Sequence, residues 1–242
     1  MQETLFVSDI HLDEKRSMII DLFNQFLLKR AINADALYIL GDLFEYWIGD
    51  DAPYHEYQET FRAIKSVTEN NVPVYFLHGN RDFLVAQRFA KQTGVSLLNE
   101  ELVVKVYDQK TLLMHGDTLC TDDLAYQKFR KKTHNKFLQW LVLHLPVTLR
   151  EKLARNLRDT SAQAIAEKSS DIMDVNQSAV EDALARNQAT LMIHGHTHRP
   201  GIHEFSLNQQ LCKRAVLGDW YTQGSVLSIT PNEMKLESFS QM

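Results

Sequence analysis

Five short apolar segments of this chain are each followed by an Asp, His or Asn, and this pattern constrains the fold more than any other feature. The segments cover residues 4–7, 36–40, 72–77, 111–114 and 190–193. Short apolar runs with polar flanks are typical of buried β-strands. The polar residues that follow them are Asp9, His11, Asp42, Asn80, His115, His196 and His198. Because ligands bind beyond the carboxyl ends of strands in open α/β sheets, we expect these side chains to converge at one edge.

Helical and further strand patterns fill the rest of the chain. Amphipathic helices are expected from residue 17, over residues 56–70, over 83–92 and over 174–186. Further short strands are expected over residues 102–107, 202–205, 212–217, 225–229 and 234–239. The alternation of strands and helices, followed by a strand-rich end, predicts α/β layers around mixed sheets. Since no repeat or low-complexity linker interrupts it, we expect residues 1–242 to form a single domain.

Composition excludes several classes of protein. The 242 residues include only two cysteines, Cys120 and Cys212, too few for a disulfide framework or a zinc–thiolate cluster. The N-terminus lacks the basic and apolar regions of a signal peptide. No apolar run approaches the roughly 18 residues of a membrane-spanning helix. A cytoplasmic protein, soluble or peripheral to a membrane, is therefore expected.

The seven polar residues supply two carboxylates, four imidazoles and one amide oxygen. This mixed set suits Mn²⁺, Fe or Zn²⁺ better than Ca²⁺ or Mg²⁺ alone. Seven donors are too many for one four-coordinate zinc. They suit two ions about 3.5–4 Å apart, the arrangement used for displacement at phosphorus. Each residue could instead be an ordinary turn residue, Asp42 and Asn80 especially, because Gly-Asp and Gly-Asn favour turns.

The motifs Asp9-x-His11, Gly41-Asp42, Gly79-Asn80, His115 and Gly195-His196-x-His198 resemble the signature of the calcineurin-like metallophosphoesterases. The resemblance implies a β-sandwich flanked by helices. It implies one ion held by Asp9, His11, Asp42 and His198, and a second held by Asp42, Asn80, His115 and His196. Asp42 would bridge the two ions, and a water activated between them would be the nucleophile.

Arg81 departs from this superfamily, in which many members carry a histidine directly after the Gly-Asn. Arginine does not give up a proton at working pH, so no general acid stands there. A leaving group that needs no protonation is expected, and a phosphate leaving from a pyrophosphate meets this condition. The Arg81 guanidinium also suits bidentate contact with phosphate oxygens. An ordinary surface arginine at the start of a helix is the alternative.

Residues 122–171 form an insertion between two of the donor-bearing strands. From Lys128 to Arg158 it carries nine Lys or Arg and one acid, a charge of +8 against −13 for the remaining residues. Its leucines and aromatic residues recur at helical spacing, and Pro146 is expected to divide it into two helices. The pattern is compatible with simple packing under a solvated basic face, or with a membrane-surface or lipid-binding element. Nucleic acid would explain the charge but not the leucines.

Longer stretches resemble one branch of the superfamily, the pyrophosphatases that act on UDP-2,3-diacylglucosamine in lipid A biosynthesis. The stretches are residues 38–51, 78–84, 115–123, 172–177 and 193–199. The resemblance implies water attack at the α-phosphorus, which gives UMP and 2,3-diacylglucosamine 1-phosphate. It implies two Mn²⁺ ions, an inserted helical cap over residues 122–171 that holds the acyl chains, and a monomer at the cytoplasmic face of the inner membrane.

The same resemblance implies roles for individual residues. Asp42, Asn80, Arg81 and His196 would be catalytic. The substrate would contact Asn80, Arg81, Asp123, Ser161, Lys168 and His196, with Tyr126 and Arg158 as further candidates. Ile165 stands where the branch has an asparagine, which removes one polar contact. Asp117 would orient a histidine ligand or serve as a turn residue, and His78 and His194 would be structural.

Three rival functions remain at this level. A phosphoesterase for nucleotides or phosphoproteins would not need a leucine-rich insertion. A non-catalytic lipid-binding protein would be expected to lack a metal ligand, and all seven are present. A nucleic-acid-binding module would place aromatic residues, rather than leucines, among the basic residues. The sequence therefore predicts a protein that does not bind nucleic acid.

Overall fold

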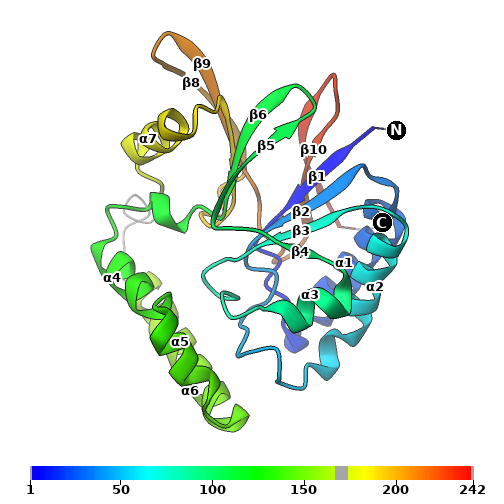
Figure 1. Cartoon of the computed structure of the whole chain (residues 1–242), viewed down its shortest axis with the longest axis vertical. Helices are drawn as coiled ribbons and strands as arrows, with labels where there is room; N and C mark the ends of the chain where they lie inside the picture. Colours follow the sequence, from blue (N-terminus) through cyan, green and yellow to red (C-terminus); the bar gives the residue numbers. More distant parts are fainter. Residues whose placement is uncertain (1, 167–173, 241–242) are drawn as a thin grey trace.

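The computed structural model describes residues 2–166 and 174–240, the stretch 159–166 by its backbone alone. Two β-sheets pack against each other, and helices cover their outer faces (Figure 1). This arrangement confirms the expected α/β layers.

The first sheet has six strands in the order β11-β10-β1-β2-β3-β4. They are β1 (Thr4–Val7), β2 (Ala36–Leu40), β3 (Val74–Leu77), β4 (Ser96–Leu97), β10 (Gly224–Ile229) and β11 (Met234–Phe239). Strands β1 to β4 run parallel, whereas β10 and β11 are antiparallel to their neighbours. The carboxyl ends of β1, β2 and β3 therefore lie at the same edge.

The second sheet has five strands in the order β5-β6-β7-β9-β8. They are β5 (Glu101–Val106), β6 (Gln109–Met114), β7 (Leu191–His194), β8 (Gly201–Leu207) and β9 (Gln210–Val216). The central strands β6, β7 and β9 are parallel, and the edge strands β5 and β8 are antiparallel. The two donor-bearing strands β6 and β7 are thus neighbours, and they end on the same side.

Alternation along the strands divides the apolar residues between separate cores. In β1, Leu5 and Val7 face the helical layer while Phe6 enters the core between the sheets. In β7, Ile193 faces the inter-sheet core and Met192 faces α7. Both faces of these strands are buried, which is why their sequences are continuously apolar.

The helical layers are α1 (Ser17–Lys29), α2 (Gln58–Glu69) and α3 (Gln87–Thr93) on the first sheet and α7 (Gln177–Asn187) on the second. Short 3₁₀ turns cover Glu14–Arg16, Ala31–Asn33, His55–Tyr57 and Asp117–Leu119. The expected helix over residues 83–92 is wrong at its start, since α3 begins only at Gln87. The carboxylate of Asp50 accepts hydrogen bonds from the backbone N–H groups of Ala86 (3.0 Å) and Phe89 (2.9 Å), which fixes that start.

The insertion is an arm of helices that extends away from the sheets (Figure 1). Its helices are α4 (Leu124–Thr133), α5 (Lys136–Leu143) and α6 (Val147–Ala166), so the expectation of two helices is wrong. Pro146 does precede α6, but a further break comes at Asn135, whose side chain accepts hydrogen bonds from the N–H groups of Phe137 and Leu138. Within the part of the chain described, no helix combines the length and apolar character needed to cross a bilayer.

Candidate metal centre

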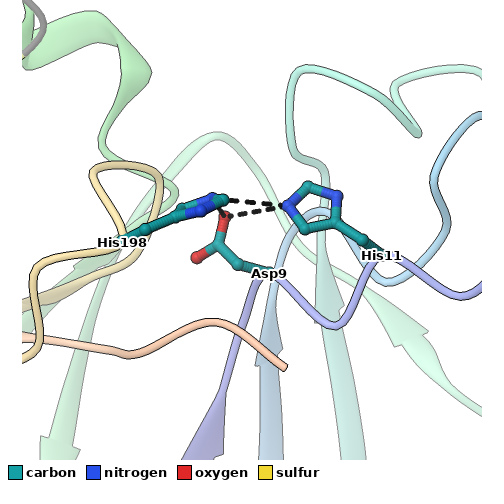
Figure 2. Close-up of side chains that lie close together, drawn as sticks. All are labelled: Asp9, His11 and His198. Atoms are coloured by element: carbon teal, nitrogen blue, oxygen red, sulfur yellow. Dashed lines mark hydrogen bonds and ion pairs between the residues drawn. The ribbon is translucent and has the colours of Figure 1, made fainter. Parts of the chain in front are cut away.

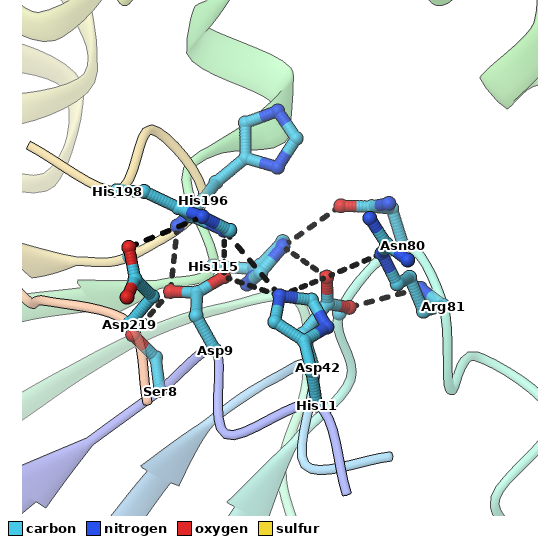
Figure 3. A network of polar contacts seen from close by, with 12 residues as sticks. Ser8, Asp9, His11, Asp42, Asn80, Arg81, His115, His196, His198 and Asp219 are labelled. Carbon is cyan, nitrogen blue, oxygen red and sulfur yellow. Dashed lines mark hydrogen bonds and ion pairs between the residues drawn. The ribbon is translucent and has the colours of Figure 1, made fainter. Parts of the chain in front are cut away.

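All seven expected donors lie at the carboxyl ends of strands from both sheets. Asp9 and His11 follow β1, Asp42 follows β2 and Asn80 follows β3. His115 follows β6, and His196 and His198 follow β7. Figure 3 shows these side chains above the strand ends, where a network of polar contacts joins all of them except the ring of His196.

The first group consists of Asp9, His11 and His198 (Figure 2). Asp9 Oδ1 lies 3.3 Å from His198 Nε2 and 3.9 Å from His11 Nε2. The two Nε2 atoms are 3.3 Å apart. Asp9 Oδ1 is buried and, among the described residues, accepts no hydrogen bond. Two ring nitrogens and a buried carboxylate oxygen that face one point are suited to hold a cation.

The second group consists of Asp42, Asn80 and His115. His115 Nε2 lies 3.0 Å from Asn80 Oδ1 and 3.8 Å from Asp42 Oδ2. The same Asp42 oxygen is 3.9 Å from His11 Nε2 in the first group. Asp42 Oδ2 therefore lies between the two groups. Asp9 is also shared, because its carboxylate lies near both His198 and the pair of Asp42 and His115.

His196 contributes to the centre through its backbone. Its backbone N–H donates a 2.9 Å hydrogen bond to Asp9 Oδ2, which holds that carboxylate in place. Its ring stands apart from the polar network, with its centroid 5.1 Å from that of His115 (Figure 3).

The backbone sets the direction of the donor side chains. Asp9, His11, Asp42, His196 and His198 have φ values of 54°, 50°, 52°, 70° and 54°. This left-handed region is uncommon for residues other than glycine, and such conformations cluster at functional sites. The turns after β1, β2 and β7 thus place the side chains of their donors in directions that ordinary turns would not give.

Glycines of the motifs leave room for the donors. A Cβ at Gly79 would lie 2.1 Å from Asp42 Oδ1, and one at Gly195 would lie 2.2 Å from Asp9 Oδ2. A Cβ at Gly41 would lie 2.7 Å from His115 Nδ1, and Gly41 also has a φ of 89°. The glycine that precedes each of Asp42, Asn80 and His196 is therefore needed for close packing.

Burial and neighbouring charges shift the pKa values of the donors. Burial raises the pKa of Asp42, and Asp82 and Asp9 add to this effect. Burial lowers the pKa of His115, but Asp42 and Asp9 outweigh it and raise the pKa to about 9. Burial opposes ionisation of Asp9, yet the contact with His198 holds the pKa of Asp9 far below its usual range. Burial and the charge of His115 lower the pKa of His196 to about 4, so its ring is neutral near pH 7. Neutral imidazole and ionised carboxylate are the forms that bind metals. His196 is already in this form near pH 7, whereas His115 would lose its proton when an ion binds.

Supporting residues that the motif analysis missed surround the donors. Asp82 is buried and accepts hydrogen bonds from the N–H groups of Leu43 and Gly79, both at 2.8 Å. His115 Nδ1 lies 2.9 Å from the carbonyl oxygen of Leu40, and His198 Nδ1 lies 3.4 Å from Asp219 Oδ2. Asp82 could have been found from the sequence, because it ends the stretch His-Gly-Asn-Arg-Asp. Asp219 could also have been found from the sequence, because it follows Gly218 directly after the strand expected over residues 212–217, as Asp42 follows Gly41 after its strand.

Of the other expected substrate-binding residues, some lie beside the donors, some lie on the arm, and the rest fall outside the described part of the chain. Arg81 lies beside the donors. Its backbone N–H donates a 2.9 Å hydrogen bond to Asp42 Oδ1, and its side-chain Nε lies 3.7 Å from Asp42 Oδ2. The Tyr126 ring centroid is 5.7 Å from that of His196. Asp123 lies at the start of α4, where its side chain accepts a hydrogen bond from the N–H of Tyr126, and Arg158 contacts Asp13 and Glu45. Lys168 and the side chains of Ser161 and Ile165 lie outside the described residues.

Asp117, His78 and His194 each have specific contacts. Asp117 accepts hydrogen bonds from the Tyr126 hydroxyl (2.8 Å) and Arg130 Nε (2.6 Å), so it holds arm residues at the start of a 3₁₀ turn. His78 Nε2 lies 2.7 Å from the Val85 carbonyl oxygen. His194 is buried, and its Nδ1 lies 2.8 Å from the Gly195 carbonyl oxygen.

Comparisons with known proteins agree with this geometry. Residues 3–200 match the profile of the calcineurin-like phosphoesterases, and the chain belongs to this family. Within the family, it is 50% identical over 236 residues to proteins from Escherichia coli O7:K1, Shigella dysenteriae serotype 1 and Escherichia fergusonii. Each of these relatives is named UDP-2,3-diacylglucosamine hydrolase, and each match covers 98% of this chain and 98% of the relative.

Proposed function

We propose that this chain hydrolyses the pyrophosphate of UDP-2,3-diacylglucosamine to UMP and 2,3-diacylglucosamine 1-phosphate, a step of lipid A biosynthesis. The observation that carries the proposal is a buried carboxylate–imidazole centre next to a helical arm with an exposed apolar surface. The names and 50% identity of the relatives support the same substrate.

The donor set fits two divalent cations. Asp9, His11, Asp42 and His198 would hold one ion, and Asp42, Asn80, His115 and His196 would hold the other. Mn²⁺ is proposed because the donors combine oxygen and imidazole nitrogen and include no thiolate. The bound ions would activate a water molecule and neutralise the phosphate oxygens.

The protein groups around this centre suit attack at the α-phosphorus. Water adds to phosphorus as the bond to the bridging oxygen breaks, and the sugar 1-phosphate departs with that oxygen. Because a phosphate has a pKa of about 6, its departure needs no proton donor. Arg81 supports this step, since its guanidinium is fixed by Asp42 and Glu45 and stays charged. The proposed catalytic residues are Asp42, Asn80, Arg81 and His196.

The arm supports an acylated substrate. The described parts of α4 and α5 contain no buried residue, yet they carry large apolar side chains that are exposed, among them Leu124, Phe137 and Trp140. Large apolar side chains that are exposed together on one element are typical of a surface that binds a partner or ligand. We propose that residues 122–171 are the acyl-binding cap of a single domain, 1–242. Asn80, Arg81, Asp123, Tyr126, Arg158, Ser161, Lys168 and His196 would contact the substrate.

The same surface supports a peripheral location at the cytoplasmic face of the inner membrane. A basic amphipathic arm with an exposed Trp140 is suited to an anionic lipid surface. We expect a monomer in solution and no binding to nucleic acid.

The test is hydrolysis by metal-stripped protein, with and without added Mn²⁺, of UDP-2,3-diacylglucosamine and of a non-acylated UDP-sugar. We expect UMP release only with Mn²⁺ and a strong preference for the acylated substrate. Equal turnover of both would leave a metallophosphoesterase without a lipid substrate. Turnover of neither by metal-loaded protein would favour a non-catalytic lipid-binding function instead.

A further inference from the structure

Glu45 is a buried carboxylate at the metal centre that belongs to neither donor group. It lies three residues beyond Asp42, and it is 5% exposed. Its two oxygens face four other groups: Arg81 Nη1, Arg158 Nε at 3.1 Å, His11 Nδ1 at 3.6 Å and Arg16 Nη2 at 3.6 Å. One carboxylate therefore contacts a candidate metal ligand, a proposed catalytic arginine and the arm.

The contact with His11 matters because His11 faces the centre through its other nitrogen. His11 Nε2 is the atom near Asp9, Asp42 and His198, whereas Nδ1 is buried and, within the described part of the chain, makes no hydrogen bond. A histidine that binds a metal through Nε2 carries its proton on Nδ1, and that proton requires an acceptor. Glu45 Oε2 is placed to become this acceptor after a small shift.

The contacts with the two arginines join the centre to the arm. Arg81 and Arg158 both reach Glu45 Oε1, and Arg158 also lies 3.4 Å from Asp13 Oδ2. Arg158 belongs to α6, and Arg81 follows β3. Glu45 thus fixes the Arg81 guanidinium on one side and holds α6 close to the strand ends on the other.

We propose that Glu45 is a positioning residue that orients the metal ligand His11 and the guanidinium of Arg81, and that docks α6 onto the centre through Arg158. The inference deepens the proposed function and rests on it for its kinetic part. Its metal-binding part can be tested without any substrate.

The first experiment measures Mn²⁺ affinity of the metal-stripped full chain by calorimetry. Glu45→Gln keeps the size of the side chain but removes its charge, and we expect 10- to 100-fold weaker Mn²⁺ binding, the usual effect of losing a group that orients a ligand. Glu45→Asp keeps the carboxylate and should bind Mn²⁺ with intermediate affinity. The matched control is Glu3→Gln. Glu3 lies directly before β1, at the end of the strand opposite to the donors, and it also pairs with an arginine, Arg30, at 2.7 Å.

The outcome of this experiment is decisive in each case. Unchanged Mn²⁺ affinity of Glu45→Gln would overturn the proposal. An equal loss in Glu3→Gln would also overturn it, because general destabilisation would then explain the effect. Thermal melts of all variants detect such destabilisation directly.

The second experiment is a double-mutant cycle on turnover of UDP-2,3-diacylglucosamine. Arg158 is 41% exposed, so Arg158→Gln should fold. We expect Arg158→Gln alone to raise KM several-fold, and Glu45→Gln alone to lower kcat. In the Glu45→Gln background, Arg158→Gln should raise KM much less than it does in the wild type, because the two residues share one contact. Full additivity would mean that Arg158 acts independently of Glu45, contrary to the proposal. If the wild-type chain does not hydrolyse this substrate, the proposed function fails, and the Mn²⁺ titrations still test Glu45.

Discussion

At the scale of the residue, the centre combines unusual backbone conformations with close packing. Left-handed conformations at residues other than glycine carry a free-energy cost of about 1–3 kcal/mol each. Five candidate donors adopt them, so the surrounding sheets must hold these turns in place. The order Gly-Asp, Gly-Asn and Gly-His reflects this packing, because a side chain at any of these glycines would meet a donor.

Substitutions of Asp42 and Arg81 should separate metal binding from catalysis. Asp42 Oδ2 lies 3.9 Å from His11 Nε2 and 3.8 Å from His115 Nε2, so Asp42→Ala removes an oxygen common to both groups. We expect this variant to lose both ions and essentially all activity. Arg81→Ala should retain both ions and lose rate. Elemental analysis of dialysed protein, alongside kinetics, checks both expectations, and full metal content in Asp42→Ala would refute the bridging role.

Gly79 tests the packing argument. In Gly79→Ala the new Cβ would lie 2.1 Å from Asp42 Oδ1 and 2.4 Å from the Asp42 backbone nitrogen, so Asp42 must move. We expect a loss of stability of about 1–3 kcal/mol and a marked loss of Mn²⁺ affinity.

The matched control for Gly79 is Gly201→Ala. The nearest neighbour of its Cβ would be His203 Nε2 at 3.4 Å, an ordinary contact. Denaturant unfolding and metal titration should leave Gly201→Ala close to the wild type. If Gly79→Ala also behaved like the wild type, the glycines of the motif would have another explanation.

At the scale of the element, the start of a helix is fixed either by a side chain from a distant segment or by one directly before the helix. The start of α3 is held by Asp50, which belongs to the loop after β2. The same carboxylate accepts a 2.9 Å hydrogen bond from Trp47 Nε1. In α5, by contrast, the cap is Asn135, directly before the helix. Local pattern can identify the second kind of cap but not the first.

Asp50→Ala should therefore destabilise the fold by about 1–2 kcal/mol, since loss of a capping side chain has roughly this effect. Asp108→Ala is the control, because Asp108 is fully exposed and pairs only with Lys105, among the contacts described, at 3.1 Å. A surface pair of this kind contributes about 0–1 kcal/mol. Equal urea midpoints for the two variants would contradict the assigned role of Asp50.

At the scale of the whole molecule, the basic arm is joined to the acidic body by arginines. Buried Arg150 donates to the Ile48 carbonyl oxygen at 2.6 Å and to Asp51 at 2.8 Å. Arg130 pairs with Asp117 at 2.6 Å and with Glu100 at 3.1 Å. Arg158 adds a third such contact, with Asp13 and Glu45, so part of the charge asymmetry in the sequence serves attachment of the arm.

The apolar face of the arm gives a prediction about the substrate. Leu153 and Leu157 lie one turn apart on α6 and are 39% and 46% exposed. Substitution of either by Gln should raise KM for UDP-2,3-diacylglucosamine about tenfold. The acyl chains would bury these side chains, and full burial of a leucine contributes about 1.5–3 kcal/mol to the free energy of binding. Metal content and the slow turnover of a non-acylated UDP-sugar should not change.

Leu28→Gln is the control for this prediction, since Leu28 on α1 is 49% exposed and lies outside the arm. The same rise in KM for Leu28→Gln, or no rise for the α6 variants, would separate the arm from acyl-chain binding.

Local sequence was sufficient for much of this protein. Apolar runs predicted β1 and β2 to the residue, as residues 4–7 and 36–40, because buried strands need continuous apolar side chains. The residues after the strands gave the seven candidate donors, and we expected them at one edge because parallel strands bring their carboxyl ends together. The fold class and the convergence of the donors followed from these two facts.

Tertiary structure decided what depends on contacts between distant segments. The start of α3 depends on Asp50, and the place of Asp117 depends on Tyr126 and Arg130 of the arm. Glu45 acquires its contacts only when β1, β3 and α6 meet at the strand ends. Such pairings span many residues and leave no periodic pattern in the chain, because they depend on how whole elements pack rather than on neighbouring residues.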